Sequence, residues 1–510
     1  KILTLKSKIL KIIRGNLFML NPMLMCDFYK LSHREQYPTG TEIVYSTLVP
    51  RSNKHYQHSD NVVVYGFQAF VKKYLIDYFN KEFFDQPKQQ VVEDYKRIVK
   101  HALGKENPPT AHIEKLHDLG YLPIQIRALE EGTVVKPGTP ILTVENTHSD
   151  FFWLTNYLET IISTQTWQPM TSATLSYDLR TLFDNYAMET VGNTNDVDFQ
   201  GHDFSMRGMS SLESSELSSS AHLLSFKGTD TVPAIPFLEQ YYNANVENEL
   251  VGASISATEH SVMCANGDYE TMNEYNTYHR LLTEIYPEGV FSVVSDTWDF
   301  WKVMTETLPQ LKDIIMKRNG KVVIRPDSGD PVKILCGDPN ALTEWERKGA
   351  VEVLWDTFGG TLTDKGYKLL DSHIGLIYGD SINYERAEKI FELLKEKGFA
   401  STNVVLGIGS FSFQFNTRDT HGFAIKATYT KGQYGEKLIY KDPKTDNGTK
   451  KSHKGRVVVY KDGTVIDSLK LHDWLQYQNK DQLKILFDNG KLTRETSLSE
   501  IREKLGKTSK

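Results

Sequence analysis

The chain has 510 residues, of which 39% are hydrophobic and 24% are charged, a balance that excludes a disordered tail or a low-complexity polymer. The 59 Lys and Arg residues against 65 Asp and Glu residues give a net charge of −6, which disfavours a dedicated nucleic-acid-binding protein. Because no apolar run approaches the roughly 20 residues that span a bilayer, no membrane insertion is expected.

The first third of the chain indicates a β-rich region with helices. Residues 1–18 are basic, lack Asp and Glu, and are interpreted as an N-terminal extension, either a targeting segment or a frayed helix. Helical spacing of apolar residues predicts helices over 61–80, after a short strand, and over 88–103. Short β-branched runs between turn residues over 121–146 predict antiparallel strands. The apolar segment 151–163 predicts a buried helix.

The middle of the chain follows a different pattern, in which short apolar strands end in polar residues. Such strands are predicted at 291–296, 322–329, 374–380 and 404–410. Between the last two, 384–397 is an amphipathic helix with Asn383 placed to cap its start and Gly398 placed to end it. Strand, helix and strand make a unit whose strands run parallel, and chemistry in such α/β folds collects at the carboxyl ends of the strands.

The last segment returns to β-hairpins. Asp462-Gly463 and Asn489-Gly490 each separate two apolar runs, which is typical of a tight hairpin turn. Ser497 and Glu500 have the spacing of a capping box, which predicts a terminal helix. The three cysteines, Cys26, Cys264 and Cys336, form no CxxC pair, which favours a reducing cytoplasm.

Polar residues at the predicted strand ends are the first candidates for chemistry. Arg325 and Asp327 stand on a turn fixed by proline and glycine, where an arginine suits a phosphate and a carboxylate suits ribose hydroxyls or Mg²⁺. Asp296 and Asp380 add carboxylates in the same predicted layer. The alternative is an Arg–Asp pair that only fastens a loop.

Three further segments have both a chemical and a structural interpretation. His260, between Glu259 and Ser261, could transfer a proton or a phosphoryl group, or it could be an ordinary buried histidine. Segments 201–211 and 226–231 could stack a flat ring and bind an amide and a phosphate, or could form a loop core. Neither a P-loop nor a GxGxxG motif is present; Gly407, Gly409 and Ser410 form either an anion-binding turn or a plain one.

Together these segments resemble the nicotinamide phosphoribosyltransferase family, of the type II phosphoribosyltransferases, over about Asn21 to Lys504. The matching stretches are 27–30, 36–38, 202–204 with 207–208, 220–222, 226–231, 259–261, 292–296, 324–329, 379–380 and 417–419. The resemblance implies an α/β fold with an irregular parallel α/β barrel core, and a second β-rich α+β domain formed from both chain ends. It also implies domains at 19–165 with 419–510, and at 166–418.

The resemblance implies a reaction as well as a fold. A homodimer with shared active sites would transfer the 5-phosphoribosyl group from phosphoribosyl pyrophosphate to nicotinamide with Mg²⁺, giving nicotinamide mononucleotide and pyrophosphate in NAD salvage. The implied site residues are Phe204 with Tyr29 of the partner subunit at the pyridine ring, Asp230 at the carboxamide, Arg207, His260 and Arg325 at pyrophosphate, Asp327, Gly379 and Asp380 at ribose, and Gly409, Ser410 and Arg418 at the 5-phosphate.

The remaining expectations concern ATP, the phosphate turn and more distant cations. His260 would carry a phosphoryl group from ATP, with Asp296 and Asp327 completing the catalytic set. Arg51 and Lys426 are further candidates for phosphate across the dimer interface. Ser410 and Phe411 stand where the family has glycines in its phosphate-binding turn. Phe411 is expected to narrow the tunnel through which substituents of the pyridine ring would pass.

Two alternatives remain open. A nicotinate phosphoribosyltransferase would bind a carboxylate, which the Asp230 carboxylate would repel, so nicotinamide is the expected substrate. A non-catalytic binding or signalling protein on the same fold is the more remote alternative.

Overall fold

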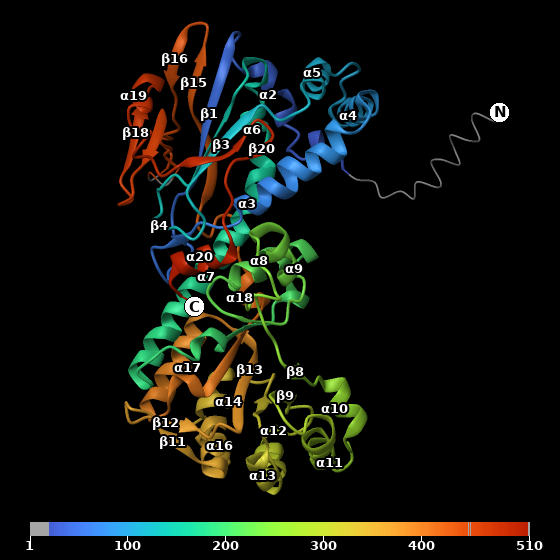
Figure 1. Ribbon diagram of the computed structural model, residues 1–510, viewed down its shortest axis with the longest axis vertical. Coiled ribbons are helices and arrows are strands. Elements are labelled where there is room, and N and C mark those ends of the chain that lie inside the picture. The colour runs from blue at the N-terminus through green and yellow to red at the C-terminus, as the bar shows by residue number, and fades with distance from the viewer. Residues whose placement is uncertain (1–19, 447, 449, 508–510) are drawn as a thin grey trace, which may run out of the picture.

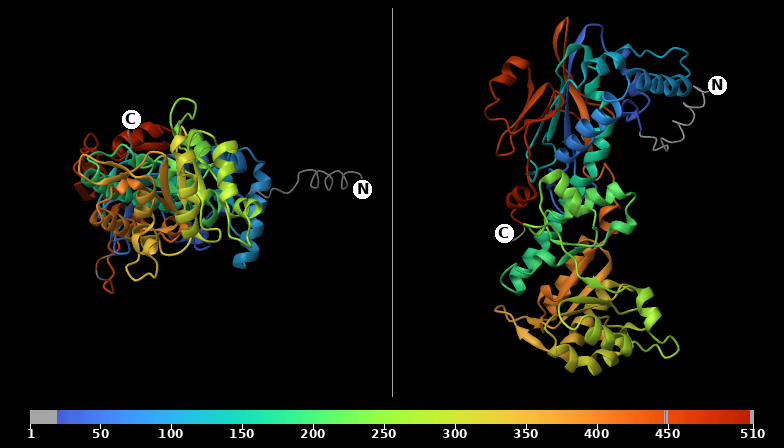
Figure 2. Two further views of the ribbon diagram at one scale, coloured as in Figure 1. Left: turned by 90° about the horizontal axis from the view of Figure 1, so that it is seen from below. Right: turned by 45° about the vertical axis from the view of Figure 1, so that its right-hand side comes forward.

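The computed structural model describes residues 20–507 apart from 447 and 449, and shows two lobes along the longest axis of the molecule. In Figure 1 one lobe holds most of the antiparallel strands and the other holds the parallel strands. Figure 2 shows the same separation after a turn about the vertical axis. The extension expected at residues 1–18 lies outside the described residues.

The first lobe is built on a seven-stranded antiparallel sheet that joins the two ends of the chain. Its strand order is β16-β15-β1-β5-β3-β19-β20. Strand β1 pairs with β15 along its whole length, from Thr41 opposite Gly432 to Pro50 opposite Phe423. The bounds are β1 Thr41–Pro50, β3 Ile124–Ala128, β5 Leu142–Asn146, β15 Phe423–Gly432, β16 Gly435–Leu438, β19 Lys484–Asp488 and β20 Lys491–Leu492.

The predicted hairpins of this lobe are confirmed. Asn489 and Gly490 both have positive φ, as a two-residue turn between β19 and β20 requires. Asp462 and Gly463 lie between strands β17 (Arg456–Val459) and β18 (Val465–Leu469), which pair with each other. A small two-stranded pairing joins β2 (Val62–Val63) to β4 (Val134–Val135).

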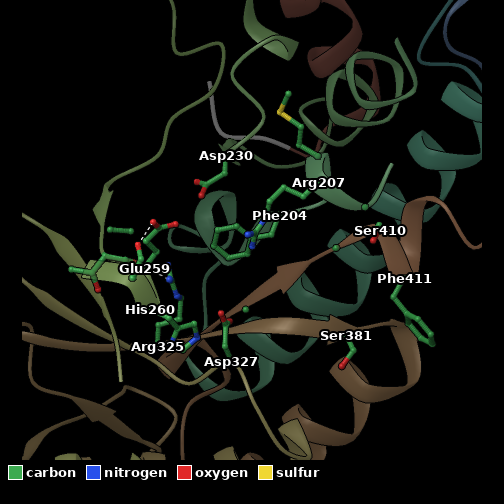
Figure 3. Close-up of a pocket in the computed structure, with 17 residues that line it drawn as sticks. Phe204, Arg207, Asp230, Glu259, His260, Arg325, Asp327, Ser381, Ser410 and Phe411 are labelled. Atoms are coloured by element: carbon green, nitrogen blue, oxygen red, sulfur yellow. Dashed lines mark hydrogen bonds between the residues drawn. The ribbon is translucent and has the colours of Figure 1, made fainter. Parts of the chain in front are cut away.

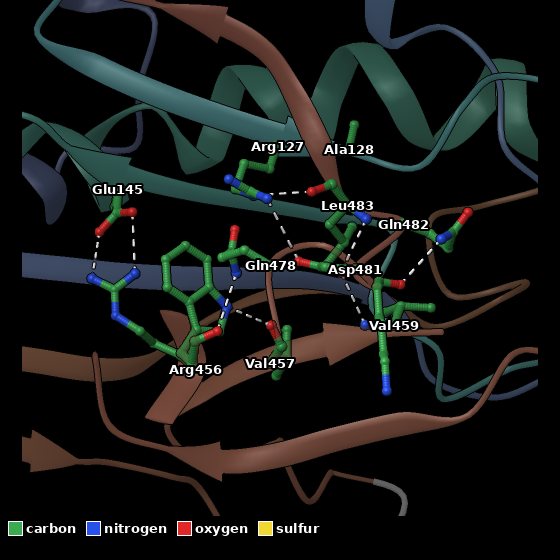
Figure 4. A network of polar contacts seen from close by, with 12 residues as sticks. Arg127, Ala128, Glu145, Arg456, Val457, Val459, Gln478, Asp481, Gln482 and Leu483 are labelled. Carbon is green, nitrogen blue, oxygen red and sulfur yellow. Dashed lines mark hydrogen bonds and ion pairs between the residues drawn. The ribbon is translucent and has the colours of Figure 1, made fainter. Parts of the chain in front are cut away.

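A buried arginine fastens β17 to the central sheet (Figure 4). The Arg456 guanidinium donates two hydrogen bonds to Glu145 of β5, at 3.1 and 2.6 Å. It also lies 4.8 Å from the Tyr45 ring and 4.6 Å from the Tyr429 ring, on β1 and β15. A paired and stacked guanidinium suits an interior position, because both of its terminal nitrogens donate to a carboxylate and its flat faces contact rings.

Helices cover this sheet and the seam beside it. The predicted helix over 88–103 is confirmed as α4 (Lys88–Leu103), which Gly104 ends in the left-handed region. The segment 61–80 holds the predicted short strand and then helical turns. The other helical segments are η1 Pro22–Leu24, α2 Lys30–Gln36, α3 Phe67–Phe70, η2 Val71–Tyr78, η3 Asn80–Phe84, α5 Ala111–Leu119, η4 Ser149–Phe151, α6 Leu154–Tyr157 and α19 Leu471–Leu475.

The second lobe is built on a parallel sheet that closes on itself, so that its strands follow one another in chain order around a ring. Its order is β7-β6-β14-β13-β10-β9-β8, and a bridge between Gly228 and Ala253 brings the two edges together, so that the sheet curves into an irregular barrel. The bounds are β6 Gly201–Asp203, β7 Gly228–Thr229, β8 Ser256–Ala257, β9 Phe291–Val294, β10 Val322–Arg325, β13 Ile374–Ile382 and β14 Val404–Ile408.

Helices on the outside of the barrel connect these strands. Helix α17 (Tyr384–Glu396) begins as predicted, with the Asn383 side chain accepting from the Arg386 amide, and the chain turns at Gly398. The other segments are η5 Val197–Phe199, η6 Met206–Gly208, α8 Leu212–His222, α9 Ala234–Tyr242, α10 His260–Asn266, α11 Tyr275–Arg280, η7 Leu281–Ile285, α12 Phe300–Lys302, η8 Val303–Thr307, α13 Leu308–Lys317, α14 Pro331–Cys336, α15 Glu344–Lys348, α16 Ala350–Phe358, η9 Ser401–Asn403 and α18 Ser410–Phe413, with a hairpin of β11 Gly360–Leu362 and β12 Lys368–Leu370.

One long helix crosses from one lobe to the other, and here the sequence prediction was wrong in its bounds. The helix expected over 151–163 is interrupted after α6 and then continues as α7, from Glu159 to Thr190. Its polar middle is buried because threonine hydroxyls donate to carbonyls four residues earlier, as from Thr166 to Ile162 and from Thr174 to Met170. Hydroxyls satisfied in this way allow a helix to remain buried without an apolar sequence.

The end of the described chain lies against the seam between the lobes. Helix α20 (Leu498–Leu505) begins with the predicted capping box of Ser497 and Glu500. Its Arg502 donates to the carbonyls of Leu223, Leu250 and Val251 in the barrel lobe. Across the described part of the chain, the helices are all too short or too polar to span a bilayer.

Candidate active site

A cavity of about 790 Å³ lies at the carboxyl ends of the parallel strands (Figure 3). Phe204 follows β6, Asp230 follows β7, Arg325 ends β10 and Gly409 follows β14. The strands run parallel, so the residues that follow them meet at one mouth of the barrel. The cavity brings together these predicted residues: Phe204, Arg207, Asp230, His260, Arg325, Asp327, Gly379, Gly409 and Ser410.

One side of the cavity carries an aromatic ring and a carboxylate. Phe204 packs against His202, with ring centroids 4.6 Å apart. Oδ1 of Asp230 accepts hydrogen bonds from Nε2 of His202 at 2.8 Å and from the Ser254 hydroxyl at 2.5 Å. Burial raises the pKa of the Asp230 carboxyl, but these hydrogen bonds outweigh burial and leave that pKa below its usual value. Asp230 is therefore a carboxylate at neutral pH.

A second carboxylate, that of Asp203, is buried behind this side of the cavity. Asp203 is fully buried and accepts from the hydroxyls of Ser205, Thr229 and Thr231 at 2.6, 2.7 and 2.9 Å. Burial opposes its ionisation, yet His222 and the hydroxyls of Ser205, Ser219 and Thr229 hold its pKa below the usual value. Its carbonyl also accepts from the Asp230 amide at 2.9 Å. Asp203 stands inside the 202–204 motif, but nothing local in the sequence indicates this role.

The opposite side carries a histidine, an arginine and two carboxylates. Nε2 of His260 lies 3.8 Å from Oδ1 of Asp296, and the His260 side chain is half exposed to the cavity. Oδ2 of Asp296 accepts from the Asp327 amide at 2.9 Å and from the Ser328 hydroxyl at 2.6 Å. Asp296 thus fixes the turn that presents Asp327, and it does not line the cavity itself.

Arg325 is held with one donor still available. Its Nη2 donates to the Thr258 carbonyl at 2.7 Å. Its buried Nε has no hydrogen-bond partner among the described residues. A buried donor without a partner is costly, which indicates that a ligand oxygen completes the site.

Glu274 lies behind the histidine side of the cavity. It is almost fully buried, and its Oε1 has no hydrogen-bond partner in the described part of the chain. Burial, with Asp296 and Asp299 nearby, raises the pKa of Glu274 to about 7. The sequence offered no signal for this residue, because nothing local marks a single glutamate as buried.

The predicted phosphate turn is a tight corner at the start of α18. Ser410 is the first residue of this short helix, and its hydroxyl lies against Gly208 of η6. Phe411 lines the cavity, stacks on Phe415 with centroids 5.7 Å apart, and has Arg386 over its ring at 5.5 Å.

Four predicted residues lie away from this cavity in the single chain. The exposed Tyr29 is 57% accessible and packs on His33, and Arg418 extends from an exposed turn toward Asp419 at 3.5 Å. Arg51 and Lys426 line a second cavity of about 330 Å³ on the β-rich lobe. The backbone of Asp380 belongs to β13, and its side chain lies outside the described residues.

Comparisons with known proteins follow the same division of the chain. The model of the nicotinate phosphoribosyltransferase (NAPRTase) family matches residues 199–491, and the model of the nicotinamide phosphoribosyltransferase N-terminal domain matches residues 21–126. A nicotinamide phosphoribosyltransferase of Acinetobacter baylyi is 47% identical, over 96% of this chain and 97% of that protein. One from Mycoplasma pneumoniae is 36% identical, over 86% of this chain and 95% of that protein.

Solved structures share the fold. The nicotinate-nucleotide pyrophosphorylase of Pyrococcus furiosus covers 96% of both chains with a TM-score of 0.55 at 14% identity. Human nicotinic acid phosphoribosyltransferase covers 95% of this chain and 93% of its own, with a TM-score of 0.54 at 14% identity. At this identity the likeness concerns the fold, and it confirms the expected α/β barrel with an additional β-rich region.

Proposed function

Because the chain belongs to the nicotinamide phosphoribosyltransferases of the NAPRTase family, we propose that it transfers the 5-phosphoribosyl group from phosphoribosyl pyrophosphate to nicotinamide. The products are nicotinamide mononucleotide and pyrophosphate, in NAD salvage. The observation that carries the proposal is that one cavity holds a ring-stacking Phe204 and a charged Asp230 on one side, and Arg325 with His260 on the other.

The choice of nicotinamide rests on Asp230. An ionised carboxylate accepts a hydrogen bond from the amide NH₂ of nicotinamide and repels the carboxylate of nicotinate. The low pKa of Asp230 keeps that charge in place at neutral pH. We therefore rank nicotinate second, and a non-catalytic binding or signalling role below it.

The reaction requires the site to stabilise two opposite charges, a positive charge that develops at ribose C1 and the negative charge of the departing pyrophosphate. The pyridine nitrogen forms a bond to ribose C1 while the bond from C1 to pyrophosphate breaks, and C1 gains positive character. The departing pyrophosphate would accept hydrogen bonds from Arg207, His260 and Arg325. Nε of Arg325, which has no partner among the described residues, would donate one of them. Asp327 and Gly379 would lie at the ribose, and Gly409, Ser410 and Arg418 at the 5-phosphate.

Mg²⁺ fits the carboxylates at this cavity, Asp327 on its wall and Asp296 just behind it, as a companion of the substrate. Among the described residues no group of three or more His, Cys, Asp or Glu side chains could hold a metal alone. Oδ1 of Asp296 is buried without a hydrogen bond in that same part of the chain, and Asp327 adds a second carboxylate. Mg²⁺ typically uses one or two carboxylates with substrate phosphates, and when bound it neutralises the pyrophosphate.

We also propose that ATP phosphorylates His260. Its side chain is half exposed at the cavity wall, and Nδ1 lies 3.2 Å from the Thr297 hydroxyl. A phosphoryl group there would add charge beside the pyrophosphate and its Mg²⁺. The exposure of the ring and the nearby Asp296 support this role. Loss of ATP stimulation in His260→Ala is expected, and unchanged stimulation would contradict it.

A homodimer with shared active sites completes the proposal. Tyr29 is exposed, and Arg51 and Lys426 line a separate cavity on the β-rich lobe. None of the three lines the barrel cavity of the same chain, so they are free to contribute a ring and two cations to the site of a partner subunit. Mixed dimers of Tyr29→Ala and Asp230→Ala should recover activity; no recovery would contradict shared sites. The unpaired state of Cys26, Cys264 and Cys336 supports our expectation of a reducing, cytoplasmic setting.

The test of the function is a direct assay. Formation of the mononucleotide from nicotinamide and phosphoribosyl pyrophosphate is measured with and without ATP, and the same assay is repeated with nicotinate. Turnover of nicotinamide with little turnover of nicotinate is the expected result. Comparable turnover of both substrates would contradict the role assigned to Asp230.

A further inference from the structure

His202 and Ser254 both donate to one oxygen of Asp230, and this arrangement determines which oxygen faces the ligand. Both bonds end on Oδ1, at 2.8 and 2.5 Å. Within the described residues Oδ2 accepts no hydrogen bond, although Asp230 lines the cavity and its side chain is 43% exposed. Figure 3 shows the Asp230 carboxylate on the same side of the cavity as the Phe204 ring.

The direction of these bonds follows from the chemistry of the partners. An ionised carboxylate only accepts, so Nε2 of His202 carries a proton and donates it in this contact. The Ser254 hydroxyl must likewise donate. With two donors on Oδ1, the charge of Asp230 is stabilised and the plane of its carboxylate is fixed.

The backbone opposite His202 makes this placement possible. His202 of β6 pairs in register with Gly228 of β7. A Cβ at position 228 would lie 2.6 Å from Nδ1 of His202, closer than a side-chain carbon approaches another atom. A glycine on β7 therefore makes room for the imidazole, which then reaches Asp230 just beyond the end of the same strand.

We propose that His202 and Ser254 are positioning residues that fix Asp230 with Oδ2 toward the carboxamide, so that they set the affinity and selectivity for nicotinamide. This inference rests on the proposed function. The amide NH₂ of nicotinamide donates to Oδ2 while the ring lies on Phe204, which itself packs on His202. Without the two donors, the carboxylate can rotate, and its proton affinity rises.

The experiment compares His202→Leu, which removes the donor, with His202→Gln, which keeps an NH donor on a side chain of similar length. His202→Leu is expected to raise the KM for nicotinamide roughly 10- to 100-fold, the effect of a lost hydrogen bond to a charged group. The kcat and the KM for phosphoribosyl pyrophosphate should stay within about 2-fold, because those terms depend on other residues. His202→Gln should restore most of the nicotinamide affinity.

Two further variants keep the inference testable if His202→Leu does not fold. Ser254→Ala removes an exposed hydroxyl and should raise the nicotinamide KM about 5- to 10-fold. Gly228→Ala should displace the imidazole and reproduce the effect of His202→Leu. The matched control is His472→Leu on the exposed face of α19, which should leave every constant unchanged.

The outcomes separate this inference from the proposed function. Wild-type protein that neither binds nor converts nicotinamide would overturn both. An active wild type whose His202→Leu and Ser254→Ala variants keep its nicotinamide KM would overturn only the positioning role. Equal losses in kcat and in both KM values, without rescue by His202→Gln, would show a purely structural histidine and would also overturn it.

Discussion

The Ser410 hydroxyl occupies the space that a side chain at Gly208 would need. Ser410 begins α18 and Gly208 ends η6, and both line the cavity. A Cβ at position 208 would overlap both Oγ and Cβ of Ser410. The two segments thus meet through one glycine and one serine, at the proposed 5-phosphate site.

Gly208→Ala should therefore impair binding of phosphoribosyl pyrophosphate by displacing Ser410. We expect its KM to rise about 10-fold or more, with a smaller change in the KM for nicotinamide. The double variant Gly208→Ala/Ser410→Gly removes the overlap and should recover much of the loss. A double variant as impaired as Gly208→Ala would show that the contact is not the cause.

Asp230→Asn should shift selectivity toward nicotinate. The substitution removes a negative charge that repels the nicotinate carboxylate, so the ratio of kcat/KM for nicotinamide to that for nicotinate should fall roughly 10- to 100-fold. The two substrates are compared in one assay. An unchanged ratio would mean that another residue selects the ring substituent.

The pH dependence of nicotinamide binding should reflect the low pKa of Asp230. Because this pKa lies below its usual value, the carboxylate stays ionised down through the ordinary range of aspartate. The KM for nicotinamide should stay constant as pH falls from 8 to about 5, and should rise only when pH falls through that low pKa. A rise centred between pH 6 and 7 would contradict an Asp230 carboxylate of low pKa.

Glu274 should make the protein less stable as pH rises. Its pKa is about 7 in the folded state against an ordinary 4.5, so folding favours the protonated form. Its contribution is fully present below about pH 4.5, and is lost as pH rises to about 7. Glu274→Gln should remove this loss and raise stability at pH 8 by roughly 1–3 kcal/mol relative to wild type, as measured by urea unfolding. Glu288→Gln, on an exposed residue, serves as the control and should change little.

Arg456 should matter for stability and little for catalysis. Arg456→Leu leaves the partly buried Glu145 without its partner and should destabilise the β-rich lobe by about 2–4 kcal/mol. Adding Glu145→Leu should recover part of the loss, because no uncompensated charge remains. Guanidinium unfolding measures both effects. A single variant as stable as wild type would show that Glu145 finds water or another donor.

The sequence predicted local features wherever the cause is local. Asn383 caps α17, Asn489 and Gly490 turn a hairpin, and Ser497 begins a capping box, as their residue types require. The bounds of α7 could not be predicted, because its buried threonines are satisfied only once the helix exists. The strands at 291 and 322 end sooner than predicted, at Val294 and Arg325, because backbone pairing ends where the cavity begins.

The identity of the candidate site residues could thus be predicted from the sequence, because they stand in motifs at strand ends and those motifs resemble a known family. Tertiary structure alone decided how they act. It placed His202 and Ser254 on one oxygen of Asp230, Asp296 beneath the Asp327 turn, and Glu274 among acidic groups. Hydrogen bonds and burial between distant segments set the charge and direction of a side chain, and no local pattern records them. Residue type is a property of the chain, whereas protonation and orientation belong to the folded site.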